Sequence, residues 1–120
     1  MSKPRRDNQY LADILEAIRR ILDYTQDLTY DGFLRSPMIQ DAVLRNLQVV
    51  GEATNKLSST LQANYPDMPW QVMAGMRDKI VHDYFGIDYQ VVWDVARGDL
   101  PQLMLQVETI LREVAGDEAD

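Results

Sequence analysis

The segment from Met76 to Phe85 holds the residues of this chain that are best suited to chemistry. His82 is the only histidine in a chain of 120 residues, and an imidazole gains or loses a proton near neutral pH. Arg77 lies five positions earlier, and its planar guanidinium can donate two parallel hydrogen bonds to a phosphate or a carboxylate. Together these two side chains could transfer a proton and hold an anion.

The spacing of these residues on a helix decides which of them can act together. Asp78 and His82 are four positions apart and share a face, so the carboxylate can orient the imidazole and raise the pKa of His82. Arg77 and Tyr84 also share a face, whereas Arg77 and His82 are about 140° apart around an uninterrupted helix. If Arg77 and His82 act together, either the helix loosens near His82 or a second copy of the chain completes the site.

Structural roles compete with these chemical ones. A single histidine on a helix more often serves packing than catalysis, and Arg77 could simply pair with Asp78 or Asp83 at the surface. The aromatic residues near the segment are expected in the core rather than against a ligand; these are Trp70, Tyr84, Phe85 and Trp93. Spacing alone therefore does not predict an enzyme.

Composition narrows the possible functions. The net charge of −7 and the pI of about 4.6 argue against a general nucleic-acid coating protein, but they leave room for an enzyme with a small basic cleft. The chain has no cysteine, which excludes disulfides and thiolate chemistry. With one histidine and no histidine pair at ligand spacing, we expect neither a metal nor a cofactor. No long apolar run or secretory signal is apparent, so we expect a cytoplasmic protein that does not enter a membrane.

The first half of the chain reads as two long helices. Apolar residues recur at spacings of three and four over Asp7–Thr25, which predicts the first helix. Gln26–Arg35 contains Asp31-Gly32, a turn signal, and Ser36-Pro37 is a favourable opening for a second helix that runs to about Ala63. Within that helix, Gly51 is either incidental or marks the close approach of another helix.

The second half reads as two further long helices and a short one between them. After the break over residues 64–69, a helix is predicted from Trp70 to about Tyr84, and Asp88 can cap a short helix from Tyr89 to Ala96. Gly98 is expected to end the short helix and Asp99 to cap the last one. The prediction is a single all-α domain over residues 1–120, with 1–6 and 116–120 as flexible ends. Its four main helices and one short helix would form an antiparallel bundle.

The residues of the chemical segment also resemble a known family. Arg77-Asp78-x-x-x-His82-x-Tyr84 is similar to the R-x-x-x-x-H-x-Y signature of the HepT-like toxins, which belong to the HEPN group of helical domains. Gly51-Glu52-Ala53 and Pro69-Trp70 also resemble the family, and the resemblance covers roughly Gln9 to Val114. Where the family often has asparagine after the arginine, this chain has Asp78, which adds a negative charge near a phosphate site.

The resemblance implies a function and a set of roles. It implies a homodimeric, metal-independent endoribonuclease that acts as the toxin of a toxin–antitoxin pair, with RNA as its substrate. Arg77 and His82 would be the catalytic pair, in a cleft at the dimer interface, and Asp78 would support His82. The antitoxin would be a small nucleotidyltransferase of the MntA kind, which attaches AMP to Tyr84. Two alternatives are a non-catalytic HEPN-type module that binds nucleotides or proteins, and a helical interaction protein in which His82 is structural.

Overall fold

The computed structural model describes residues 6–82 and 86–119, with side chains described outside 77–82 and 117–119, and every regular element in these ranges is helical. The elements are α1 (Asp7–Thr25), α2 (Tyr30–Leu34), α3 (Pro37–Lys56), α4 (Ser59–Asn64), α5 (Trp70–His82), α6 (Tyr89–Asp94), η2 (Val95–Asp99) and α7 (Leu100–Ala119). The all-α prediction is confirmed.

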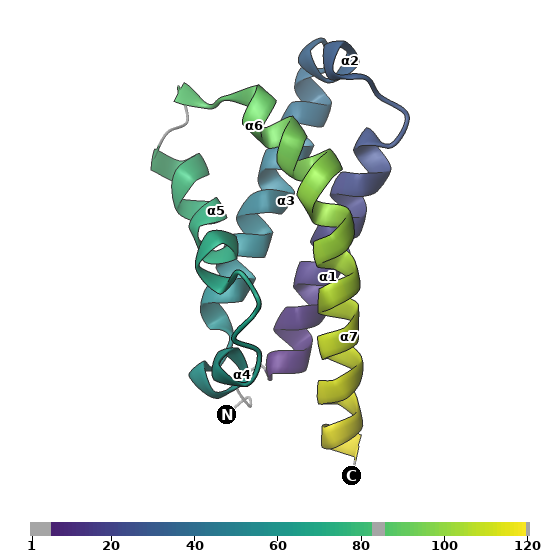
Figure 1. Cartoon of the computed structure of the whole chain (residues 1–120). Coiled ribbons are helices and arrows are strands. Elements are labelled where there is room, and N and C mark those ends of the chain that lie inside the picture. Colours follow the sequence, from purple (N-terminus) through teal and green to yellow (C-terminus); the bar gives the residue numbers. More distant parts are fainter. Residues whose placement is uncertain (1–5, 83–85, 120) are drawn as a thin grey trace, which may run out of the picture.

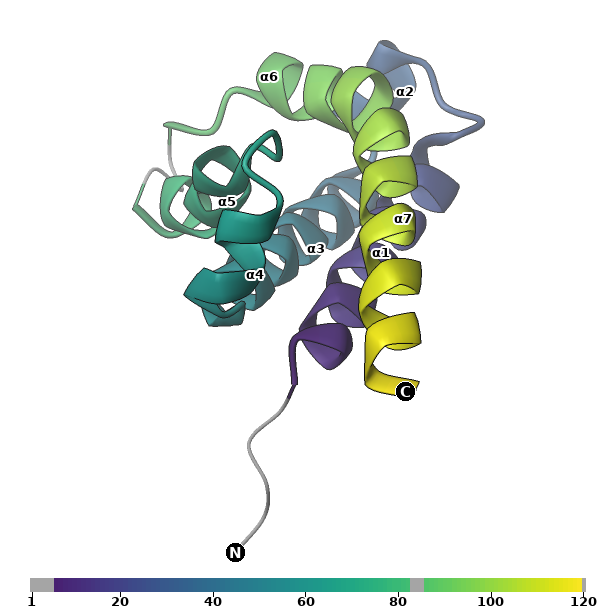
Figure 2. The same ribbon diagram turned by 60° about the horizontal axis from the view of Figure 1, so that its bottom comes forward.

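The four long helices are α1, α3, α5 and α7, and consecutive members of this series run in opposite directions (Figure 1). Helix α1 packs against both α3 and α7, and α3 also packs against α5. Helix α5 therefore lies at the edge of the bundle, on the far side of α3 from α1, as the second view also shows (Figure 2). The short helices α2 and α6 lie together at one end of the bundle.

Helix α1 supplies the centre of the core. Its bounds agree with the sequence prediction, and the side chains of Leu11, Ile14, Ile18 and Ile21 have no exposed surface. The spacing of three and four puts them on one stripe, and burial of each such side chain contributes roughly 1.5–3 kcal/mol to folding. The last helix, α7, contributes Leu103, Val107 and Ile110 to the same core.

The segment predicted as a turn around Asp31-Gly32 is instead the short helix α2. The hydroxyl of Thr29 accepts a hydrogen bond from the amide of Gly32 at 3.0 Å, which caps the helix. Phe33 follows and is completely buried. Burial of this one aromatic ring explains why helix prevails over the local turn preference.

Ser36-Pro37 opens the next helix as predicted, but Ser36 does not act as its cap. Its hydroxyl donates to the carbonyl of Gly32 at 2.8 Å and so satisfies the end of α2, while Pro37 occupies the first turn of α3. Gly51 and Ala53 are both buried on α3, a helix that packs against both α1 and α5. Their burial favours the interpretation of Gly51 as a point of close helix approach.

The second predicted helix, expected to reach Ala63, is divided in two. Helix α3 ends at Lys56, and Ser58 caps the separate helix α4 by accepting from the amide of Leu61 at 3.1 Å. The carboxylate of Asp7 accepts from the amide and the hydroxyl of Ser58, at 2.9 and 2.6 Å. This long-range contact compensates for the break in the helix and ties the start of α1 to the corner between α3 and α4.

The predicted stop at Gly98 and the cap at Asp99 are wrong, because α6, η2 and α7 form one continuous helical run. The amide of Leu100 donates to the carbonyl of Val95, five residues back, which makes η2 a π-helical turn. Ala96 and Leu100 are both buried, so the run keeps its contact with the core on either side of Gly98. The run continues to Ala119, past Gly116, the first residue of the predicted flexible tail.

Candidate active site

Helix α5, which carries the predicted catalytic residues, is anchored at its start by Trp70. The indole N–H of Trp70 donates to the carbonyl of Tyr65 at 2.9 Å and to that of Gln62 at 3.2 Å. These carbonyls lie at the end of α4, where they also accept from the amides of Met68 and Tyr65, so the indole fastens the start of α5 to that end. Because Trp70 is also buried in the core, as predicted, the position of α5 is set from this end.

The backbone of Arg77, Asp78 and His82 lies in the last two turns of α5. The side chains of these three residues, and the whole of Tyr84, lie outside the described residues, as does Phe85. The structure therefore places the predicted catalytic pair on one helix without giving the distance between their functional groups.

The backbone course of α5 bears on how that pair could meet. The helix is α-helical through His82, so it does not loosen between the two positions. Arg77 and His82 therefore stand about 140° apart around the helix axis. Of the two arrangements open from the sequence, a local loosening before His82 does not occur.

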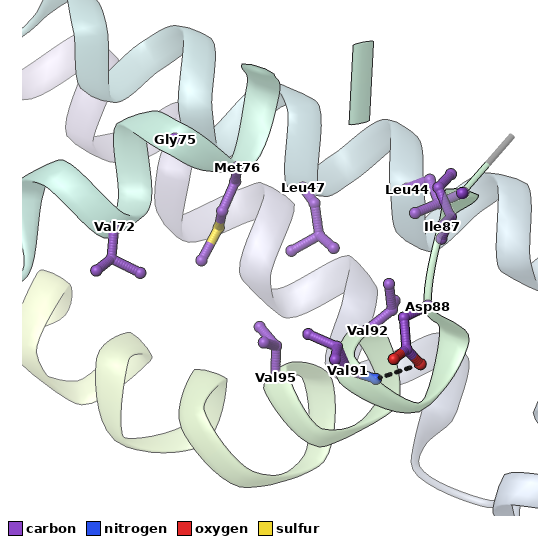
Figure 3. Close-up of a pocket in the computed structure, with 11 residues that line it drawn as sticks. Leu44, Leu47, Val72, Gly75, Met76, Ile87, Asp88, Val91, Val92 and Val95 are labelled. Atoms are coloured by element: carbon purple, nitrogen blue, oxygen red, sulfur yellow. Dashed lines mark hydrogen bonds between the residues drawn. The ribbon is translucent and has the colours of Figure 1, made fainter. Parts of the chain in front are cut away.

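A cavity of about 450 Å³ opens directly beside this end of α5, and we call it the α5–α6 groove. Val72 and Met76 of α5 face Val91 and Val95 across the opening, with Leu47 of α3 behind them (Figure 3). The lining residues are Leu44, Leu47, Val72, Gly75, Met76, Gly86, Ile87, Asp88, Val91, Val92 and Val95. They stand on both sides of the predicted catalytic segment in the chain, since Met76 precedes Arg77 and Gly86 follows Phe85.

Among the described residues, the lining of the α5–α6 groove is aliphatic apart from Asp88 at its end, which is charged. As predicted, Asp88 caps α6, because its Oδ1 accepts from the amides of Gln90 and Val91 at 3.0 and 3.4 Å. Two apolar side chains that line the groove are well exposed: Val72 is 66% and Val91 is 41% accessible. An apolar surface of this kind is suited to binding a ligand or a partner.

Helix α6, the wall of the groove opposite α5, is held in place by aromatic contacts. The ring centroid of Phe33 lies 5.4 Å from that of Trp93 and 6.1 Å from that of Tyr89, and Tyr30 lies 6.2 Å from Trp93. This cluster pins α6 onto α2, and it confirms that Trp93 has a packing role. A second contact fixes η2, which continues from α6: the guanidinium of Arg97 donates to the hydroxyl of buried Thr25 at 3.3 Å.

Sequence reasoning did not find this groove. A signal for it was present, because Val72 and Met76, and likewise Val91 and Val95, are four positions apart and form short apolar stripes. Neither stripe predicts a groove by itself, since its existence depends on how far α5 and α6 stand from each other in the fold. None of the helices that the structure describes is long and apolar enough to cross a membrane.

The fold defines an all-α helical bundle, and comparisons with known proteins give the family. A model of the family described as ribonuclease HepT-like matches residues 14–110. "Putative RNase MJ0127" of Methanocaldococcus jannaschii is 40% identical over 116 residues, which are 96% of this chain and 96% of that protein. "Probable ribonuclease HepT" of Thermococcus cleftensis is 38% identical over 106 residues, covering 88% of this chain and 96% of that protein. No solved structure matches the chain at a significant level.

This chain belongs to the HepT-like ribonuclease family, since the family model covers most of its length and its relatives match almost end to end. The resemblance drawn from the sequence is thereby confirmed, and with it the prediction of a ribonuclease. The roles of individual residues, the dimer and the antitoxin are separate questions.

Proposed function

We propose that this chain is the toxin of a toxin–antitoxin pair, a homodimeric endoribonuclease that cuts RNA without a metal ion at Arg77 and His82. Membership of the HepT-like ribonuclease family supports the activity. The observation that carries the arrangement is that α5 is α-helical through His82, with the two catalytic positions on different sides of the helix. Arg77 of one copy and His82 of the other would then form each site.

The chemistry needs a proton carrier and a stabiliser of negative charge. His82 takes the proton of the ribose 2′-hydroxyl, and the 2′-oxygen attacks the neighbouring phosphorus. The bond from phosphorus to the 5′-oxygen breaks, and the leaving oxygen receives the proton from His82. Arg77 donates to the phosphate oxygens as charge develops on them. The products are a 2′,3′-cyclic phosphate and a free 5′-hydroxyl, and Asp78 holds the imidazole in its orientation.

A cleavage assay tests these roles. In His82→Ala or Arg77→Ala, cleavage of RNA and inhibition of bacterial growth should fall at least about a hundredfold, the lower range for loss of general acid–base catalysis. The helical circular-dichroism spectrum should be unchanged. Arg19→Ala is the matched control, because Arg19 is an exposed arginine on α1 at the other side of the bundle. Full activity in either site variant would rule out its assigned role.

The antitoxin part of the proposal is the transfer of AMP to Tyr84. A small nucleotidyltransferase would join the AMP of ATP to the phenol oxygen and release pyrophosphate. Bulk and negative charge at Tyr84, seven positions from Arg77, would exclude RNA by steric hindrance and by repulsion of phosphate. Mass spectrometry after co-expression should find AMP on the wild-type chain and none on Tyr84→Phe, which should remain toxic. AMP on Tyr84→Phe would place the modification elsewhere.

A further inference from the structure

We propose that the α5–α6 groove binds a nucleobase of the RNA substrate, and that Asp88 makes guanine the preferred base. The proposal rests on the ribonuclease function and adds a specificity-determining residue to it. It begins from position: Met76, which lines the groove, is bonded directly to Arg77, and consecutive Cα atoms lie about 3.8 Å apart. A base beside a phosphate held at this end of α5 is therefore within reach of the groove.

The walls of the groove suit a flat aromatic ring. Leu47, Met76, Val91 and Val95 present aliphatic or thioether surface to the opening (Figure 3). A base buries its two apolar faces against such walls, and a methionine sulfur makes favourable contacts with aromatic rings. The volume of about 450 Å³ is within the range of small-molecule pockets and exceeds what one base requires.

The charge of the groove selects the base part of a nucleotide over its phosphate. Among the described residues that line it, Asp88 is the charged one, so a phosphate in the groove would meet a carboxylate that repels it. The edge of a base carries no charge and can donate N–H groups to that carboxylate. One nucleotide thus contacts both places, with its base in the groove and its phosphate at Arg77.

The geometry of Asp88 favours guanine among the four bases. Its Oδ1 is engaged by the amides of Gln90 and Val91, which hold the carboxylate in one orientation, and its Oδ2 takes part in neither bond. Guanine presents two neighbouring donors, N1–H and the N2 amino group, with no acceptor between them. The lone pairs of Oδ2 can accept from both donors, whereas adenine, cytosine and uracil present a single donor group on this edge with an acceptor directly beside it, which a carboxylate repels.

Binding of nucleoside 3′-monophosphates to His82→Ala protein tests the groove without relying on cleavage. Methyl NMR signals of Met76, Val91 and Val95 should shift on titration, and guanosine 3′-monophosphate should bind about tenfold more tightly than the other three. Asp88→Asn should remove this preference while keeping the cap of α6, because asparagine also caps helices. Val91→Trp should fill the groove and abolish the shifts. Leu105→Trp is the matched control, since Leu105 is 60% exposed on α7 and does not line the groove.

Three results would overturn the proposal. The first is the absence of shifts at the groove methyls, and the second is a guanosine preference that survives in Asp88→Asn. The third is a change from dimer to monomer in Val91→Trp by light scattering, which would make the groove a contact between copies of the chain. A parallel cleavage assay on the wild-type protein separates the two proposals. Cleavage without groove binding contradicts only the base site, whereas guanosine binding without cleavage contradicts only the catalytic proposal.

Discussion

The two sides of this bundle are built differently. Helix α1 packs between α3 and α7 and contributes four large apolar side chains with no exposed surface. Helix α5 packs mainly on α3, and α6 contributes no buried residue. The α1 side has the deeper core, whereas the side with the shallower core carries the predicted catalytic segment and the groove. Stability and chemistry are thus largely separated within a chain of 120 residues.

The largest difference in stability between the two sides is expected when a cavity is opened on the α1 side. Ile18→Ala should lower the free energy of unfolding by about 2–5 kcal/mol, because Ile18 is completely buried. Urea unfolding gives that value, and RNA cleavage per folded molecule should be unchanged. Val72→Ala on α5 is the counterpart, where stability should change by less than about 0.5 kcal/mol since Val72 is 66% exposed. Equal losses at the two positions would show that the sides do not differ.

A smaller effect should appear where the two sides meet, at the anchor of α5. Trp70→Phe keeps a ring in the core but removes the indole donor to two carbonyls, which should cost about 1 kcal/mol. It should also lower RNA cleavage per folded molecule, because the catalytic residues lie on the helix that Trp70 anchors. Trp93→Phe is the same substitution in the aromatic cluster of α6, where a ring against Phe33 is retained. A larger loss of cleavage in Trp93→Phe than in Trp70→Phe would contradict the anchoring role.

Much of the fold could be predicted because its long helices follow from local periodicity. The stripe of α1 and the cap at Asp88 depend on residues a few positions apart, and both are as expected. The predictions were wrong where contacts between residues far apart in the sequence determine the local structure. Helix α2 exists because Phe33 is buried, α4 is separate because Asp7 holds Ser58, and the run through Gly98 continues because Ala96 and Leu100 both reach the core.

The residues of the candidate site remain a prediction from the sequence, whereas the groove beside them was found only in the structure. Arg77 and His82 were identified from their chemical types and from the resemblance to HepT-like toxins. The α5–α6 groove depends on the packing of α5 on α3 and of α6 on Phe33, which no spacing in the sequence encodes directly. The position of α6, and hence of Asp88, is a property of the assembled fold.

The most direct test of the two-copy site uses dimers that contain one Arg77→Ala subunit and one His82→Ala subunit. Each variant alone should be inactive, whereas a mixed dimer, purified through two different tags, retains one site with both functional groups. We expect it to cleave RNA at about half the wild-type rate, because one of two symmetric sites is intact. Mixed dimers as inactive as the separate variants would contradict a site in which Arg77 and His82 come from different copies.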